Sequence, residues 1–163
     1  KEVIVKIYGF TKVTAVIPGG KERYDSVYAG LCACEECEYV LIHDGARPFI
    51  TEEILERGLH KVKETGACVT GMPSKDTIKL ADEDGFVKET PDRKSAWIIQ
   101  TPQIFSYSLI RNAHESIRRK DMSSITDDAM VVEQETVISN NTDNRSRFML
   151  CFLSISPTII FSS

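Results

Sequence analysis

The sequence predicts an α/β fold: a mostly parallel sheet with helices on both faces and a projecting β-hairpin. Three observations lead to this prediction. Short β-branched segments alternate along the chain with longer segments whose apolar residues recur at helical spacing. One stretch, 76–91, instead alternates polar and apolar residues around a Gly-containing turn. The length of 163 residues suits a single domain, and 42% hydrophobic with 27% charged residues is an ordinary globular composition.

Four segments are predicted strands, because each is short, rich in branched apolar residues and followed by Gly, Pro or polar residues. They lie near 12–17, 39–43, 67–72 and 96–100. The hairpin near 76–91 is an excursion between the third and fourth of them.

Four segments are predicted helices, from their apolar spacing and from the residues at their ends. In 51–66, Thr51 is the predicted N-cap, Glu52 and Glu53 lie in the first turn, and Gly66 ends the helix. The other three are 25–36 with Asp25 or Ser26 as N-cap, 106–120, and 125–135 with Thr126 or Asp127 as N-cap.

Charge and composition exclude several classes of function. A net charge of -4 argues against nucleic-acid binding, which needs a basic face. No apolar run approaches the roughly 20 residues that span a bilayer, and the first ten residues lack a signal-peptide pattern. Five cysteines, an odd number, favour reduced thiols and a cytoplasmic protein. Cys32, Cys34 and Cys37 cluster without a fourth zinc ligand, so no metal site is predicted there.

The residues that carry chemistry follow the predicted strands. In open α/β sheets, ligands bind outside the carboxyl ends of the strands. Polar or Gly/Pro-rich segments stand at all four ends, at 18–26, 43–49, 72–77 and 100–105. We therefore expect one cleft at this edge of the sheet, lined by the following residues: Gly20, Ser26, Asp44, Arg47 and Thr101.

Two of these segments have a specific chemical interpretation and a structural alternative. Gly19 and Gly20 let the backbone approach a ligand closely, although a tight turn before a Ser26 cap would also explain them. Asp44 can hold a metal-bound water or a substrate hydroxyl, and Arg47 offers a planar fork for phosphate. An exposed ion pair between Asp44 and Arg47 is the alternative.

Taken together, the strings GGKERYDSV, VLIHDGARPF, KDTIK, TPDR, QTPQIF and TDDA resemble the 2-C-methyl-D-erythritol 4-phosphate cytidylyltransferases. They occur in the order of that family, over about residues 4–135. The resemblance implies a Rossmann-like nucleotidyltransferase fold and a homodimer. It also implies transfer of CMP from CTP to a sugar-alcohol phosphate with release of pyrophosphate, in non-mevalonate isoprenoid precursor biosynthesis, with Mg²⁺ as the cofactor.

The resemblance also implies roles for individual residues. The nucleotide would be held by Gly20, Lys21, Arg23 and Ser26, through backbone groups and the serine hydroxyl. Many members have an acidic residue where Lys21 stands, a change that a backbone contact tolerates. Arg93 and Asp44 would be catalytic, and an arm at 76–93 would reach into the partner's active site. The residues implied to bind the sugar-alcohol phosphate are Asp44, Arg47, Thr77, Arg93, Thr101 and Thr126, and no protein residue is implied as a metal ligand.

Two family motifs do not match: a glycine-rich loop carrying an Arg and followed by a Lys, and an Asn-Ile-Lys motif near the C-terminus. We therefore expect 1–136 to be an incomplete nucleotidyltransferase domain, 137–163 to be a divergent tail without an assigned element, and the chain alone to be poorly active. Two alternatives stay open. One is a cytidylyltransferase for another polyol phosphate, such as ribitol 5-phosphate, and the other is a non-catalytic dimerising fragment.

Overall fold

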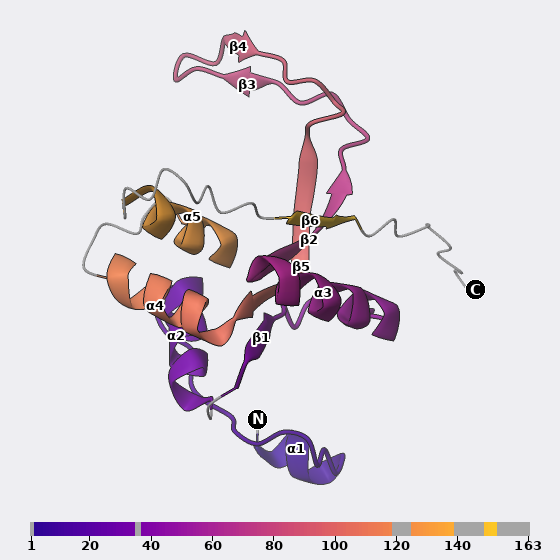
Figure 1. The fold of residues 1–163 in the computed structure, drawn as a ribbon, viewed down its shortest axis with the longest axis vertical. Helices are drawn as coiled ribbons and strands as arrows, with labels where there is room; N and C mark the ends of the chain where they lie inside the picture. Colours follow the sequence, from indigo (N-terminus) through magenta and orange to yellow (C-terminus); the bar gives the residue numbers. More distant parts are fainter. Residues whose placement is uncertain (1, 35–36, 119–124, 139–148, 153–163) are drawn as a thin grey trace. The chain divides into compact units, whose positions relative to one another are not determined.

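A computed structural model describes residues 2–34, 37–118, 125–138 and 149–152 (Figure 1). The chain divides into two compact units. One comprises Lys1–Val40 and Tyr107–Arg145, and the other comprises Leu41–Ser106 and Ser146–Ser163.

The first unit is built from helices. They are α1 (Glu2–Ile7), α2 (Arg23–Ala33), α4 (Tyr107–Ile117) and α5 (Asp128–Ile138). Helix α4 packs against both α5 and α2, because its apolar residues recur at helical spacing and form one buried face. The apolar side chains buried in this unit include Leu31, Ile110, Ala113, Ile117, Val131 and Val132.

Helix α2 begins earlier than predicted. Its N-cap is Glu22, so neither Asp25 nor Ser26 caps it. The Asp25 carboxylate still serves the helix start, because it accepts a hydrogen bond from the Glu22 backbone N–H at 3.3 Å. Asp25 was therefore correctly placed at the helix start but stands in the third helical position, where an acidic side chain reaches back to the cap.

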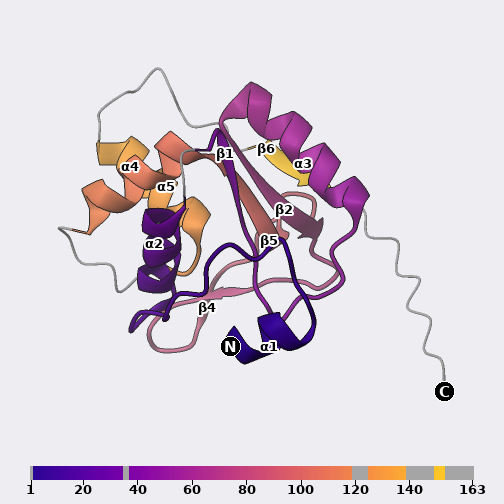
Figure 2. The ribbon, with the colours of Figure 1, turned by 90° about the horizontal axis from the view of Figure 1, so that it is seen from below.

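The second unit contains most of a four-stranded sheet. Its strands are β1 (Tyr39–Ile42), β5 (Trp97–Ser106), β2 (Ala67–Pro73) and β6 (Met149–Phe152), in that spatial order. The first two residues of β1 belong to the first unit. Helix α3 (Glu52–Thr65) packs on β2 and β5, and Figure 2 shows it running alongside these strands. As predicted, Thr51 caps α3 by accepting from the Ile54 N–H, and Gly66 ends it with a φ of 76°.

The direction of β5 differs from the prediction. β5 runs antiparallel to β2, with Ala67 opposite Phe105, whereas β6 runs parallel to β2. The reason lies in the connection: between Pro73 and Trp97 the chain forms a hairpin and no helix, so it returns to the edge that it left. A parallel strand would have required a crossover, which is usually helical, and the sequence shows none there.

The strand predicted at 12–17 is wrong. These residues are described and form no strand, and most of their side chains are exposed. A strand needs a hydrogen-bonded neighbour, and the sheets of the described residues place none beside this segment. High β-propensity alone therefore does not produce a strand here.

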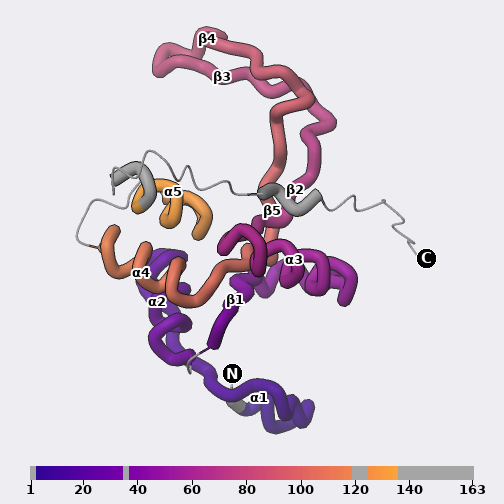
Figure 3. The backbone as a smooth tube through the Cα atoms, viewed as in Figure 1, coloured from indigo at the N-terminus to yellow at the C-terminus, as the bar shows by residue number. Residues whose placement is uncertain are grey.

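The predicted hairpin is confirmed. Strands β3 (Leu80–Ala81) and β4 (Val87–Glu89) pair antiparallel, and their turn is closed by Gly85 at a φ of 85°. The hairpin extends beyond the ends of β2 and β5 within the second unit (Figure 3). Its apolar residues are exposed: Leu80, Phe86 and Val87 are 45%, 72% and 60% accessible.

Two further observations concern the tail and the cysteines. In the segment 137–163, left unassigned by the sequence, the structure describes the last two residues of α5 and strand β6. Cys32, Cys34 and Cys37 are free and exposed, but Cys68 is disulfide-bonded, so the prediction of reduced thiols is wrong for Cys68. An odd number of cysteines does not prevent two of them from approaching within bonding distance.

Among the described residues, no helix is long and apolar enough to cross a membrane.

Candidate functional site

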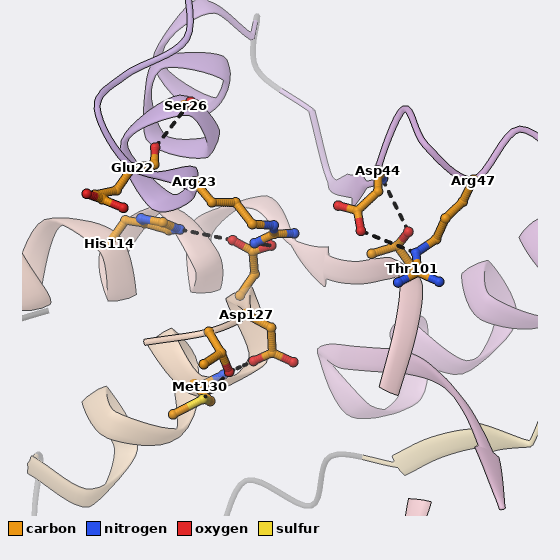
Figure 4. A network of polar contacts seen from close by, with 11 residues as sticks. Glu22, Arg23, Ser26, Asp44, Arg47, Thr101, His114, Asp127 and Met130 are labelled. Carbon is orange, nitrogen blue, oxygen red and sulfur yellow. Dashed lines mark hydrogen bonds and ion pairs between the residues drawn. The ribbon is translucent and has the colours of Figure 1, made fainter. Parts of the chain in front are cut away.

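The loop before α2 folds back on the first turn of that helix. The Gly20 backbone N–H donates to Ser26 Oγ at 2.9 Å. Ser26 Oγ in turn donates to the Glu22 carbonyl at 3.2 Å, a bond that Figure 4 shows. A Cβ added at Gly20 would lie 2.2 Å from the Asp25 Cβ and 3.0 Å from its carbonyl carbon. Gly20 is therefore required because the loop lies directly on the helix, and Ser26 fixes that loop.

Arg23 lies at the start of α2 and reaches toward α5. Its Nη1 is 2.7 Å from Asp128 Oδ2, and the Arg23 side chain is 38% exposed whereas that of Asp128 is 1% exposed. A second ion pair joins Asp25 to Arg118, the residue that follows α4, at 3.3 Å. The neighbouring Lys21 is exposed. The predicted nucleotide residues Gly20, Lys21, Arg23 and Ser26 thus lie together, in one loop and one helical turn.

A second cluster follows β1, in the sheet unit. The Asp44 backbone N–H donates to Thr101 Oγ1 at 3.2 Å, and the Arg47 side chain donates through Nε to Asp44 Oδ2 at 3.2 Å. The Arg47 side chain also contacts the Gln100 side-chain oxygen. The backbone carbonyl of Arg47 lies 2.7 Å from His43 Nε2. The side chains of Asp44 and Arg47 are 36% and 43% exposed. A guanidinium held in this way can present its remaining N–H groups to a phosphate.

The hairpin arm brings together the two residues at its base. Arg93 Nη2 donates to Thr77 Oγ1 at 3.3 Å, and both residues are exposed. Farther along the arm, Lys79 donates to Thr90 Oγ1 at 2.7 Å. Thr77 and Arg93 are 16 residues apart in the sequence, so the antiparallel pairing of the arm is what makes them neighbours.

The TDDA segment forms the start of α5. Asp127 Oδ1 accepts from the Met130 N–H at 2.9 Å, so Asp127 is the N-cap. Thr126 is exposed, and its hydroxyl lies 3.0 Å from the Met130 sulfur. Asp128 is buried within the helix and pairs with Arg23. The two neighbouring aspartates therefore serve different purposes, as expected for adjacent positions on a helix.

The pKa shifts that the structure resolves lie outside these clusters. Burial, followed by the neighbouring Cys34, raises the pKa of the Cys37 thiol. Burial, followed by Asp127, raises the pKa of the Glu133 carboxyl. A hydrogen bond from Lys61 lowers the pKa of Glu64, which is exposed on α3. The raised pKa of Cys37 makes it a weaker nucleophile at neutral pH than an unperturbed thiol.

The residues predicted to share one cleft fall in both compact units. Gly20 and Ser26 belong to the helical unit, and Asp44, Arg47 and Thr101 belong to the sheet unit. Within each unit the predicted residues are in contact. A single cleft containing all five stays a prediction.

Three residues of these clusters were not predicted from the sequence. Gln100 contacts Arg47, and it could have been found because it stands in the segment that follows the predicted fourth strand. Asp128 follows the predicted N-cap candidate Asp127, and no local pattern shows that it pairs with Arg23, 105 positions away. His114 lies within the predicted helix 106–120 and is fully buried beside Asp128.

The sequence of this chain matches one known protein family over most of its length. The family model for 2-C-methyl-D-erythritol 4-phosphate cytidylyltransferase matches residues 2–141. Proteins of that name from Lachnoclostridium phytofermentans and Alkaliphilus oremlandii are 48% and 50% identical over 133 and 134 residues. Each alignment covers 82% of this chain, but 57% and 56% of the relatives. The chain thus spans just over half the length of these relatives.

Solved structures agree with the sequence comparison. A 4-diphosphocytidyl-2C-methyl-D-erythritol synthase from Anaerococcus prevotii matches with a TM-score of 0.76 and 33% identity, over 83% of this chain and 60% of its own. The 2-C-methyl-D-erythritol 4-phosphate cytidylyltransferase from Thermus thermophilus matches with a TM-score of 0.63 and 32% identity, over 76% and 64%. The predicted fold class is confirmed, and the chain belongs to the 2-C-methyl-D-erythritol 4-phosphate cytidylyltransferase family.

Proposed function

We propose that this protein transfers CMP from CTP to 2-C-methyl-D-erythritol 4-phosphate and releases pyrophosphate. Family membership supports the proposal, and the single observation that carries it is the cluster at the end of β1. There Arg47 is held by Asp44 and Gln100 while 43% of its side chain stays exposed. An immobilised, partly exposed guanidinium next to a carboxylate suits a ligand that carries both phosphate and hydroxyl groups.

The proposed reaction is a phosphoryl-type transfer. A phosphate oxygen of methylerythritol phosphate attacks the α-phosphorus of CTP and forms a new P–O bond. The bond from the α-phosphorus to the oxygen of the β-phosphate breaks, and pyrophosphate leaves with that electron pair. Such reactions depend on positioning and on stabilisation of negative charge, which is the chemistry that fixed arginines supply.

Each cluster has a part in the proposed reaction. The loop of Gly20, Lys21 and Ser26 reads the cytosine edge through backbone groups and the hydroxyl, with Arg23 on the same turn. Asp44 and Arg47 bind the substrates at the end of β1, and Thr101 holds the Asp44 backbone in place. Thr126 would line the methylerythritol side, where its exposed hydroxyl is free of the helix cap that Asp127 provides.

Arg93 and Thr77 would act on the phosphate nucleophile. Their hydrogen bond, at 3.3 Å, holds an exposed guanidinium at the base of the arm. The apolar residues Leu80, Phe86 and Val87 are exposed on the same hairpin, and burial in a homodimer would remove them from water. We infer that the arm reaches the partner's active site, so that Arg93 serves the other subunit.

Mg²⁺ fits the proposed site as an ion held mainly by water and by the phosphates of the substrate. The described residues contain no group of three His, Cys, Asp or Glu side chains that could hold a metal ion. Mg²⁺ commonly keeps most of its ligands as water and substrate phosphates and takes only one or two carboxylates from the protein. Asp44 is the carboxylate that would hold it, and bound Mg²⁺ would neutralise charge on the triphosphate. A cytoplasmic location also stays a prediction.

Pyrophosphate release tests the proposed function. Purified protein is incubated with CTP, Mg²⁺ and methylerythritol phosphate, and the product is identified by ³¹P NMR as a diphosphate diester. The Alkaliphilus oremlandii protein is the positive control, and ribitol 5-phosphate replaces the acceptor in a parallel reaction. We expect turnover with methylerythritol phosphate to exceed turnover with ribitol 5-phosphate. Transfer to ribitol 5-phosphate but not to methylerythritol phosphate would refute the proposed acceptor. The same assay tests the expectation that the 163-residue chain is poorly active by itself.

A further inference from the structure

We propose that Asp128 is a positioning residue for the nucleotide loop, which it orients through Arg23. This inference rests on the proposed function, because that function assigns the loop before α2 to the cytosine. It concerns a residue to which the proposed reaction assigns no contact with a substrate. Asp128 therefore acts at a distance, through its ion pair.

The geometry of Asp128 supports this role. Its side chain is 1% exposed, and Oδ2 lies 2.7 Å from Arg23 Nη1. The other oxygen, Oδ1, is 3.7 Å from His114 Nε2, which is beyond hydrogen-bond distance. His114 and Asp128 are both fully buried, so water does not reach the carboxylate from that side. Burying an ionised carboxylate is costly unless a cation pairs with it, and Arg23 is the cation that pairs with Asp128.

Arg23 transmits this constraint because it is the first residue of α2. The helix cap Glu22 precedes it, and the Gly20 N–H is bound to Ser26 one turn further on. A displacement of Arg23 therefore moves the helix start that both loop hydrogen bonds use. Asp25, two residues later, pairs at 3.3 Å with Arg118, the residue that follows α4. The first turn of α2 is thus anchored at two places, by the pair with the buried Asp128 of α5 and by an exposed pair just after α4.

A role of Asp128 in capping or metal binding does not fit the structure. Asp127 already caps α5 by accepting from the Met130 N–H. No group of three metal-ligating side chains occurs among the described residues, and the two oxygens of Asp128 face Arg23 and His114. The ion pair with Arg23 is the shortest of these contacts, and it leads to the nucleotide loop.

The test substitutes Asp128→Asn, which keeps the shape and removes the charge. Glu56→Gln, on the exposed side of α3, changes the net charge equally and is the matched control. Two quantities are measured well below the unfolding midpoint: the CTP dissociation constant, by calorimetry, and hydrogen exchange of the Gly20 and Glu22 amides, by NMR. For Asp128→Asn we expect about tenfold weaker CTP binding and faster exchange at both amides, with neither change in Glu56→Gln. Asp128→Glu, which keeps the charge, should recover part of the affinity.

The two readouts separate this inference from the proposed function. If wild-type protein does not bind CTP, the proposed role of the loop fails, and amide exchange alone decides whether Asp128 positions it. A purely structural role would lower the unfolding midpoint of Asp128→Asn while CTP affinity and exchange at Gly20 and Glu22 stay at wild-type values, and that result overturns the inference. If Asp128→Asn does not fold, Arg23→Lys makes the same test from the exposed end, because lysine keeps the charge but not the planar fork. Unchanged affinity and exchange in that variant would likewise overturn the inference.

Discussion

Gly20→Ala is the substitution that most sharply tests how the nucleotide loop is built. The added Cβ would lie 2.2 Å from the Asp25 Cβ, about 1.2 Å short of the 3.4 Å at which ordinary contact begins. It would also lie 3.0 Å from the Asp25 carbonyl carbon and 3.2 Å from its Cα. Because these two atoms are backbone, no side-chain rotation can relieve the overlap. The loop must therefore move away from α2 by about an ångström.

The cost of this movement follows from the contacts that it breaks. The Gly20 N–H would leave Ser26 Oγ, which is 2.9 Å away, and the backbone groups assigned to cytosine would be displaced with it. Losing one or two hydrogen bonds at about 1 kcal/mol each corresponds to roughly 5- to 30-fold weaker binding of CTP. Calorimetric titration of CTP into wild-type and variant protein measures this loss.

Gly19→Ala is the graded comparison for this experiment. Its Cβ would meet only the Ser26 side chain, with the hydroxyl at 3.1 Å, so a small adjustment of one side chain can relieve the contact. We expect a smaller loss of CTP affinity than in Gly20→Ala. Equal affinity of wild type and Gly20→Ala would refute the reasoning, because it would show that the close packing of loop on helix does not position the binding groups.

Two further predictions concern the arm and the core. Arg93→Ala should lower the transfer rate with methylerythritol phosphate by about 100-fold, through lost positioning, while changing CTP affinity little. Lys94→Ala, which removes the neighbouring exposed cation, is the control. Equal losses of affinity for both substrates in Arg93→Ala would count against this role of Arg93. Gly58→Ala should lower the free energy of unfolding by about 1 kcal/mol, because overpacking against the buried Ile104 outweighs the gain in helix propensity. Adding Ile104→Val removes the Cδ1 atom that lies 2.2 Å from the new Cβ and should restore stability in urea titrations; no recovery would show that the cost arises elsewhere.

Local signals in the sequence predicted the elements whose ends are chemically marked. Thr51 and Gly66 bound α3 as expected, because a hydroxyl cap and a left-handed glycine act within one turn of the helix. The turn at 82–85 likewise marks the hairpin. The Asp82 carboxylate accepts a hydrogen bond from the Asp84 backbone N–H, and Gly85 adopts a positive φ. Such features depend on neighbours in the chain, so they are visible without the fold.

Features that depend on distant partners were harder to predict. The segment at 12–17 has the composition of a strand but no paired neighbour among the described strands. The antiparallel direction of β5 could have been predicted, because the segment between β2 and β5 contains a hairpin and no helical pattern. The pairing of Arg23 with Asp128 joins residues 105 positions apart, and nothing local to either residue indicates the other.

The same distinction holds for the candidate site. Asp44 and Arg47 are three residues apart, and the ion pair considered as the structural alternative is present, whereas phosphate binding by Arg47 stays a prediction. Ser26 was expected either to cap α2 or to read the nucleotide, and it instead ties the loop to the helix through Gly20 and Glu22. The chemistry of each residue type was predictable, whereas its partners required the structure.

Nucleotide selectivity tests most directly whether the loop before α2 reads cytosine. CTP and UTP carry the same triphosphate and ribose and differ only at the base edge that Gly20, Lys21 and Ser26 are proposed to contact. Parallel calorimetric titrations of the two nucleotides, at one Mg²⁺ concentration and ionic strength, isolate that edge from the phosphates. A mismatched hydrogen bond costs at least about 1 kcal/mol, so CTP should bind at least about fivefold more tightly than UTP. Equal affinities would show that the protein holds only the phosphates, and would contradict the assignment of this loop to the cytosine.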